Sequence, residues 1–240
     1  MVLENSPMVG SKAGYYSLNF PDDEELAGSE IKPWRLIALN TMDGEKTPPN
    51  QLEWLKIELK SNPHRCVLAF AHFFAFSSGR HGHEPPDFKA AGLKNAAKKA
   101  KNEAKDLKPD PYMMKVFQTL YASGASLLLS GHDHHYEQFV RQSGYEQFMR
   151  EGATQHPISD GVRSFIVGTG GTTFYKEHYK YIWPNSEKGR QFWHGILKLE
   201  LFEARYRWQF VPIDQEANKV PSDLKTPTEE DCNSRKSTTE

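Results

Sequence analysis

The residues most able to bind a metal or take part in catalysis are histidines that follow apolar runs. The segment 130–137 reads S-G-H-D-H-H-Y-E, and it places His132 and His134 on either side of one residue. A neutral imidazole nitrogen is available near pH 7, which makes histidine the commonest metal ligand. A histidine pair on a turn opened by glycine can aim two rings at one place, so this segment predicts a metal site. The alternative is a polar loop that happens to contain histidines.

A third histidine, His72, ends another apolar run at 66–71. Alone, such a histidine is more often a hydrogen-bonded structural residue than a ligand. If the runs at 66–71 and 126–129 are adjacent strands, however, His72 lies near His132 and His134. Ligands of α/β proteins bind at the carboxyl ends of strands. The three histidines together therefore favour a metal site.

The elements that would position these histidines follow an α/β order. Asn50 and Asp110 are suitable N-caps for two helices, with Glu53 in capping-box position and Pro111 at a first helical position. The run at 35–40 is too apolar for a strand with one wet face, and with the apolar strands at 66–71 and 126–129 it indicates a sheet buried on both faces. The predicted elements are strands at 15–20, 35–40, 66–71, 126–129 and 163–167, and helices at 50–61 and 110–124.

The C-terminal part has a different pattern. Apolar and polar residues alternate at 197–201 and again at 206–210, which predicts an antiparallel hairpin with one wet face. Residues 214–240 contain few apolar side chains and are expected to form a loose, disordered tail. We therefore predict one domain over residues 1–213, interrupted by a lysine- and alanine-rich insertion at about 87–110. Mixed charge favours a solvated insertion over a basic, phosphate-attracting helix.

Composition excludes several classes of partner. The formal net charge of the 240 residues is −1, so no global field attracts nucleic acid or a membrane surface. No apolar run approaches the roughly 20 residues of a membrane helix, and the first residues do not read as a signal peptide. Cys66 is expected to be a buried thiol, and Cys232 lies in the predicted tail. Pairing of the two in an oxidising compartment is the alternative, and the compartment stays open.

Several segments, in order, resemble calcineurin-like metallophosphoesterases, above all purple-acid-phosphatase-like and secreted phosphatase-like members. They are LAFAHFFAFSSGRHGH, LLLSGHDHHYEQF and GVRSFIVGTGG, together with GYYSLNF, WRLIALN and QLEWLKIEL. The likeness covers about residues 14–211. It implies an α/β/β/α sandwich with mixed sheets and flanking helices. Similar proteins are often secreted.

The resemblance also implies a chemistry and its residues. Two metal ions, about 3.5–4 Å apart, would activate a hydroxide that attacks the phosphorus of a phosphomonoester. His72 and His132 would bind one metal and His134 the other, and the metals would be iron, zinc or manganese. His81 resembles a substrate-facing histidine that contacts phosphate or protonates the leaving oxygen. A mobile surface histidine is the alternative reading of His81.

The chain departs from the family in one respect. The family's first half supplies G-D, G-D-x-x-Y and G-N-H-[DE] segments, and here no glycine is followed by Asp or Asn. Two cations held only by neutral histidines would repel each other. We therefore expect the C-terminal half of the fold, with a missing N-terminal half as partner. Part of the sheet formed by 35–40 and 66–71 is then expected to be exposed.

Three functional readings remain. The chain is a phosphomonoesterase, or a segment of one, that needs the absent half for activity. Alternatively, it is a non-catalytic family member that acts as a binding module and holds at most one zinc ion weakly. The third reading is a fragment without independent function.

Overall fold

The computed structural model describes residues 14–22, 28, 32–41, 48–61, 66–82, 111–143, 158–175, 182–183, 185–188, 191–213 and 218–233. The predicted insertion at 87–110 lies outside these residues. No helix of the described part is long and apolar enough to cross a membrane.

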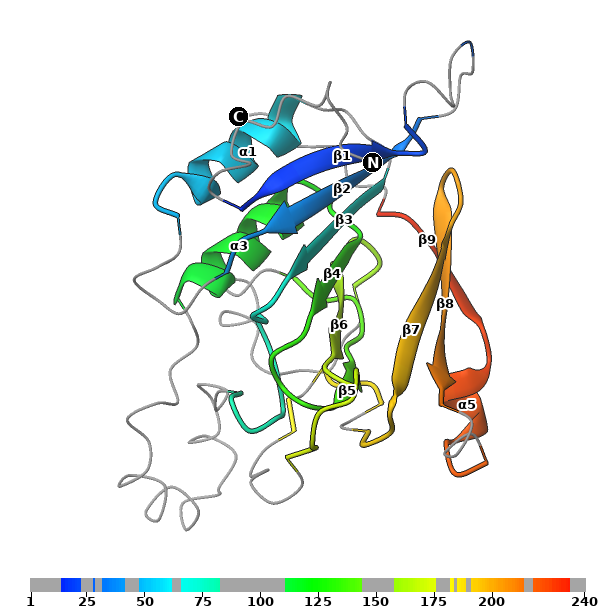
Figure 1. The fold of residues 1–240 in the computed structure, drawn as a ribbon. Helices are drawn as coiled ribbons and strands as arrows, with labels where there is room; N and C mark the ends of the chain where they lie inside the picture. Colours follow the sequence, from blue (N-terminus) through cyan, green and yellow to red (C-terminus); the bar gives the residue numbers. More distant parts are fainter. Residues whose placement is uncertain are drawn as a thin grey trace, which may run out of the picture.

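A mixed six-stranded sheet forms the centre of the molecule (Figure 1). Its inner strands are parallel, and an antiparallel strand closes each edge. In spatial order the strands are β1 (Tyr16–Phe20), β2 (Trp34–Leu39), β3 (Cys66–Ala71), β4 (Leu127–Ser130), β6 (Arg163–Val167) and β5 (Tyr136–Gln138). The predicted strands are confirmed to within about a residue at each end, and β5 is additional.

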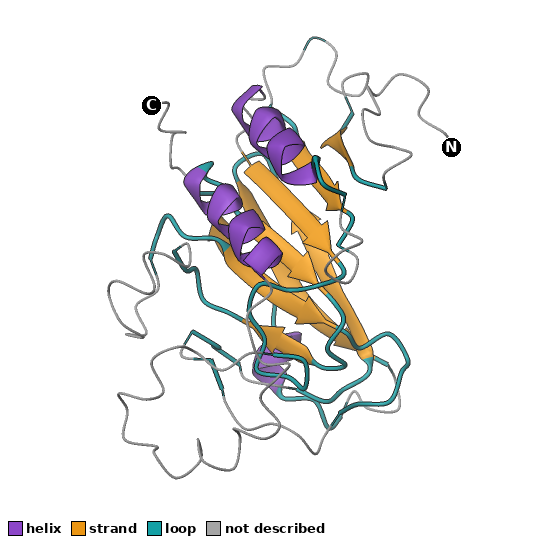
Figure 2. Ribbon diagram, turned by 90° about the vertical axis from the view of Figure 1, so that its left-hand side faces the viewer, coloured by secondary structure: helices purple, strands orange, loops and turns teal. Residues whose placement is uncertain are grey.

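Two helices cover one face of this sheet, as Figure 2 shows. They are α1 (Gln51–Ser61) and α3 (Pro111–Ala122), and both correspond to predicted helices. Their buried faces pack on the strands through residues such as Leu55, Phe117 and Ile37, each fully buried. The side chain of Gln51 exchanges hydrogen bonds with the backbone of Asn40, so the start of α1 is fixed to the end of β2.

A second, antiparallel sheet packs on the opposite face and consists of β7 (Gly195–Leu201), β8 (Arg205–Pro212) and β9 (Thr228–Asp231). β7 and β8 form the predicted hairpin. The core between the sheets joins Trp34 and Phe165 of the main sheet to Trp208 and Phe210 of β8. The described residues thus form α/β/β layers, as expected for part of an α/β/β/α sandwich.

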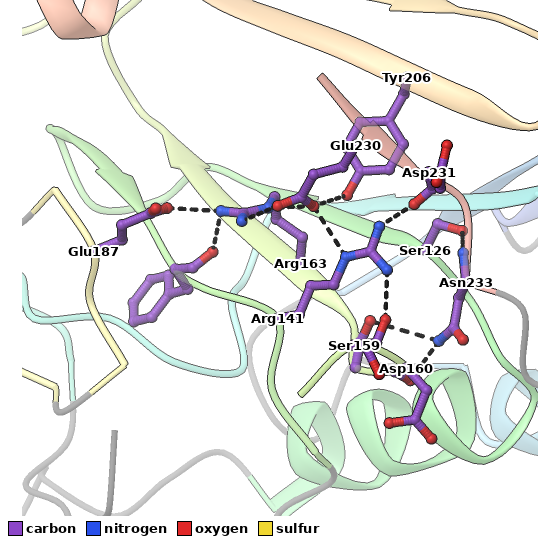
Figure 3. Close-up of polar contacts among 12 residues, drawn as sticks. Ser126, Arg141, Ser159, Asp160, Arg163, Glu187, Tyr206, Glu230, Asp231 and Asn233 are labelled. Carbon is purple, nitrogen blue, oxygen red and sulfur yellow. Dashed lines mark hydrogen bonds and ion pairs between the residues drawn. The ribbon is translucent and has the colours of Figure 1, made fainter. Parts of the chain in front are cut away.

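The C-terminal segment differs from the expected loose tail. Residues 218–233 include a short helix, α5 (Ser222–Lys225), and the edge strand β9, which pairs with β8. Cys232 forms a disulfide with Cys66 at the start of β3, so Cys66 is buried but is not a free thiol. Glu230 of β9 binds Arg163 of β6 and Arg141 (Figure 3). Glu229 and Glu230 of β9 form ion pairs with arginines. The polarity of this segment therefore reflects ion pairing within the fold and is not the mark of a disordered tail.

One part of the second-sheet face of the main sheet stays uncovered. Tyr16, Ala38 and Phe70 are neighbours across β1, β2 and β3, so their side chains share one face. Tyr16 is 39% exposed and Phe70 is 37% exposed, and Phe20 farther along β1 is 47% exposed. Of the strands expected to be exposed, at 35–40 and 66–71, Phe70 is the one exposed residue, so the expectation is confirmed at Phe70 alone. Elsewhere the second sheet covers the face.

Candidate active site

The candidate site lies at the carboxyl ends of three adjacent parallel strands, β3, β4 and β6. His72 follows β3 directly and His132 follows β4 after one glycine. The backbone N–H of Gly131 donates to the carbonyl of His72, 3.0 Å away, and joins the two strand ends. His72 Nε2 and His132 Nδ1 are 3.0 Å apart, so one of these nitrogens donates a proton to the other. The predicted proximity of His72 and His132 is confirmed.

His132 has an unusual backbone conformation, and the pKa of its ring is lowered. Its φ of 61° lies in the left-handed region, which non-glycine residues adopt at a cost and often at functional sites. Burial, together with the nearby rings of His81 and His72, lowers the pKa of its ring to about 4, against an opposing effect of Asp133. The ring therefore stays neutral at ordinary pH, which keeps a lone pair available for a ligand bond.

We expect the His132 ring of the metal-free protein to titrate with a midpoint near pH 4, well below the ordinary 6.5. In this window the unfolded chain binds a proton that the folded chain does not, so His132 lowers the stability of the fold as the pH falls from 6.5 toward 4. The pH dependence of its Cε1–H chemical shift, assigned with His132→Gln, measures the midpoint. A midpoint close to 6.5 would contradict the burial and crowding of this ring.

His134 is held by the loop that follows β6. Its Nδ1 lies 2.9 Å from the carbonyl oxygen of Thr173, and because that oxygen can only accept, Nδ1 carries the proton. The lone pair of the ring is then on Nε2. The ring also stacks on Tyr175, with centroids 4.1 Å apart and an interplanar angle of 17°. A backbone carbonyl that binds the outer nitrogen is the usual support of a metal-ligating histidine.

His81 is fixed to the same histidine turn by Asp133. Asp133 is fully buried, and its Oδ1 accepts the backbone N–H of His81 at 3.0 Å. Its Oδ2 accepts the hydroxyl of Ser77. The His81 ring is exposed, and its centroid lies 4.6 Å from that of His132. The structure therefore places the exposed His81 ring beside that of His132, and its role as a substrate-facing histidine stays a prediction.

Close packing below the cluster requires glycine at two positions. A Cβ at Gly79 would lie 2.4 Å from Asp133 Oδ2, and a Cβ at Gly168 would lie 1.9 Å from the carbonyl oxygen of Asp133. The glycine-rich segment after β6 therefore lies directly against the histidine turn at Gly168. Substitution at either position would displace the histidine turn.

A buried, hydrogen-bonded pair of His135 and Glu137 lies beneath the turn. Glu137 and His135 are both fully buried, and Glu137 Oε2 lies 3.1 Å from His135 Nε2. Burial alone would raise the pKa of Glu137, but hydrogen bonds from His135, Ser186 and Ser78 lower it overall. Glu137 is thus occupied by these contacts and supports the turn.

The donor chemistry fits the imidazole side of a metal centre. His72, His132 and His134 offer imidazole rings at adjoining strand ends, but His72 and His132 bind each other. Within the described residues, no group of three or more His, Cys, Asp or Glu side chains is arranged to hold a metal ion. Both carboxylates nearest the turn, Asp133 and Glu137, are engaged in other hydrogen bonds. The described residues by themselves therefore show no metal site.

The fold of this chain is similar to that of two solved structures. Purple acid phosphatase PPD1 from yellow lupin (Lupinus luteus) seeds superposes with a TM-score of 0.52 at 15% identity, over 82% of this chain and 30% of that one. GAP50, the anchor in the inner membrane complex of Plasmodium, superposes with a TM-score of 0.55 at 12% identity, over 93% of this chain and 55% of that one. The chain has a metallophosphoesterase-type fold. It spans about a third to a half of the length of these two proteins.

At such identities the likeness concerns the fold alone. No protein-family model matches the sequence, and no curated protein matches it. The roles of individual residues therefore depend on the geometry of this chain.

Three functional neighbours of the histidines were not predicted from the sequence. In the sequence, Asp133 is one more polar residue of the turn. Its position between His132 and His134 is the one feature that could have suggested its supporting role. Thr173 and Tyr175 lie some 40 residues from His134 in sequence, and no local pattern marks them. The loop after β6 brings them to the site.

Proposed function

We propose that this chain is the histidine-bearing part of a metal-dependent phosphoesterase that hydrolyses phosphomonoesters. The observation that carries the proposal is the convergence of four imidazoles, those of His72, His81, His132 and His134, at the carboxyl ends of adjacent parallel strands. The metallophosphoesterase-type fold supports the reaction class, since PPD1 is a phosphatase.

In this proposal His72 and His132 bind one metal ion and His134 binds a second through Nε2. Iron, zinc and manganese all accept imidazole together with oxygen ligands. When bound, such ions stabilise the charge of a phosphate and make water a nucleophile at neutral pH. Binding would replace the His72–His132 hydrogen bond, because a nitrogen lone pair cannot serve both.

The chain's own residues supply positioning and proton transfer. His81 reaches the cluster with an exposed ring, where it can donate a proton to a leaving alkoxide or a hydrogen bond to a phosphate oxygen. Asp133 holds the backbone at His81 and the turn between His132 and His134 together. The substrate-facing histidine and the metal-binding histidines thus share one support.

The remaining ligands are proposed to come from a further segment, the N-terminal half expected from the resemblance. The uncovered apolar face around Tyr16, Phe20 and Phe70 supports this partner, because such a surface is usually covered. β7 pairs on one side with β8, and among the described residues its other edge is unpaired. Strands added at β7 would extend the second sheet across this face.

Zinc binding by the purified chain tests the proposal. We expect the wild-type protein to bind zinc in isothermal titration calorimetry, and a His132→Ala/His134→Ala variant to bind at least about tenfold more weakly. His194→Ala is the control for loss of a histidine outside the proposed ligand set: His194 Nε2 lies 3.2 Å from the carbonyl oxygen of Thr172, and the variant is expected to leave the affinity unchanged. Equal affinities for the wild-type protein and the double variant would overturn the assignment of the metal ligands.

A non-catalytic binding module is the second candidate function. It is favoured by the incomplete donor set of the described residues and by the similarity to GAP50, which is described as an anchor. Turnover of p-nitrophenyl phosphate separates the two candidates. Metal-dependent turnover that disappears in the double variant supports the enzyme, whereas one zinc ion per chain without turnover, even with an added N-terminal half, supports the module.

A further inference from the structure

Arg80 differs from the other described arginines in its surroundings. Arg35, Arg141, Arg163, Arg205 and Arg207 each form an ion pair with a glutamate. Arg80 is exposed, directly precedes His81, and forms no ion pair with any carboxylate of the described residues. Its guanidinium carbon lies 4.9 Å from the ring centroid of Tyr175. An arginine that contacts an aromatic ring and lacks an acidic partner keeps its donors available for an anion.

Tyr175 holds this guanidinium beside the histidine cluster. The same tyrosine ring stacks on His134 at 4.1 Å and lies edge-on to His81 at 5.6 Å. Arg80, His81 and His134 therefore all contact one side chain. The cation–π contact also limits the range of positions that the long arginine side chain can adopt.

The loop that carries Arg80 is itself fixed. Asp133 accepts hydrogen bonds from Ser77 and from the backbone of His81, on either side of Arg80. The backbone N–H of Gly82 donates to the carbonyl of Gly79 and closes a turn around Arg80. A Cβ at Gly82 would lie 1.9 Å from the carbonyl oxygen of Ser77, so the loop is tightly packed. Arg80 is thus presented from a rigid support.

The local charge favours an anion. Arg80 brings a permanent positive charge to the histidine cluster, and Asp133, the carboxylate that holds its loop, is fully buried with both oxygens engaged. A guanidinium offers a planar pair of N–H donors that matches two oxygens of a phosphate. A phosphomonoester has three unesterified oxygens, one more than a diester. It can therefore keep two oxygens for Arg80 while another faces the histidine side.

We propose that Arg80 is a substrate-binding residue that holds the phosphoryl group of a phosphomonoester, with Tyr175 as its positioning residue. This inference rests on the proposed function and adds to it the group that selects a monoester over a diester. Tyr175 acts through its ring, so a phenylalanine can replace it.

Binding of inorganic phosphate tests the inference, measured by calorimetry with the chain in zinc-containing and zinc-free buffer. We expect Arg80→Ala to weaken phosphate binding about tenfold, as for the loss of one charge-assisted contact. Arg80→Lys is expected to recover only part of the affinity, because an ammonium lacks the planar fork. Tyr175→Phe is expected to bind as the wild type does, and Tyr175→Ala more weakly.

Arg205→Ala is the matched control, since Arg205 also lies over an aromatic ring, at 4.7 Å from Phe202, but far along the chain on β8 and paired with Glu229. Wild-type protein is also expected to bind methyl phosphate more tightly than dimethyl phosphate, and Arg80→Ala to lose this preference. Unchanged phosphate affinity in Arg80→Ala, or no phosphate binding by the wild type, overturns the inference.

The zinc titration separates this inference from the proposed function. Loss of zinc binding in the His132→Ala/His134→Ala variant supports the assignment of the metal ligands, whatever the result of the phosphate titrations. Zinc binding by Arg80→Ala that equals the wild type, together with unchanged phosphate binding, overturns the role of Arg80 alone.

Discussion

Replacing Arg163 by alanine is expected to lower the free energy of unfolding by about 3–5 kcal/mol, since the change would leave buried charge unpaired. Arg163 on β6 is 5% exposed, and its guanidinium donates to Glu230, to Glu187 and to the carbonyl of Phe139. Glu230 belongs to β9, so this arginine joins the main sheet to the second sheet (Figure 3). Urea denaturation at pH 7 measures the loss.

Two other contacts increase the expected effect. The guanidinium carbon of Arg163 lies 4.8 Å from the ring centroid of Trp208, in the core between the sheets. Glu230 also accepts hydrogen bonds from Tyr206 and Arg141, and its pKa is lowered because these donors and Arg163 outweigh the effect of burial. The stability that Glu230 contributes is therefore present above the ordinary pKa of a glutamate and is lost as the pH falls through the lowered value.

The control for this prediction is Arg205→Ala. Arg205 also pairs with a glutamate of β9, Glu229, but its side chain is 50% exposed. Exposed pairs contribute about 0–1 kcal/mol, so this variant is expected to unfold at nearly the wild-type urea concentration. Equal losses in the two variants would show that the burial of the Arg163 network does not matter. The difference between wild type and Arg163→Ala is also expected to shrink in acid, as Glu230 becomes protonated.

The inner strands and both long helices could be predicted because the residues within each segment determine its secondary structure. Strands β3 and β4 read C-V-L-A-F-A and L-L-L-S and are largely buried, which is what runs of apolar residues indicate. β5 and β9 could not be predicted in this way. The sequence of β9 is T-E-E-D, and it is a strand because β8 pairs with it and Arg163 binds Glu230. These partners are distant in sequence.

The candidate site shows the same division. The proximity of histidines at the ends of apolar runs could be predicted from the sequence, because adjacent parallel strands end at the same edge of a sheet. The contacts that orient the rings could not, since Thr173 and Tyr175 arrive on a separate loop. Arg80 stood beside His81 in the sequence, but only the unpaired state of its guanidinium among the described residues distinguishes it from other surface arginines.

Removing the disulfide is expected to destabilise the fold by about 2–5 kcal/mol, because Cys66 and Cys232 are separated by 166 residues and the link greatly restricts the unfolded chain. The bond joins the start of β3, in the middle of the main sheet, to the residue after β9. Cys66→Ala/Cys232→Ala is therefore expected to unfold at a lower urea concentration, and β9 is the strand expected to lose amide protection first.

Reduction of the wild-type protein provides the matched experiment. Dithiothreitol is expected to lower the urea midpoint of the wild type to about that of the double variant, and to leave the double variant unchanged. The contacts of Asn233 with the backbone of Asp160 and the hydroxyl of Ser126, and of Glu230 with Arg163, do not involve the disulfide. These contacts are expected to keep the second sheet in place, so zinc binding should survive reduction. An unchanged urea midpoint of the wild type in dithiothreitol would show that the disulfide adds no stability to these contacts. Loss of zinc binding on reduction would show that the histidine turn depends on the Cys66–Cys232 bond.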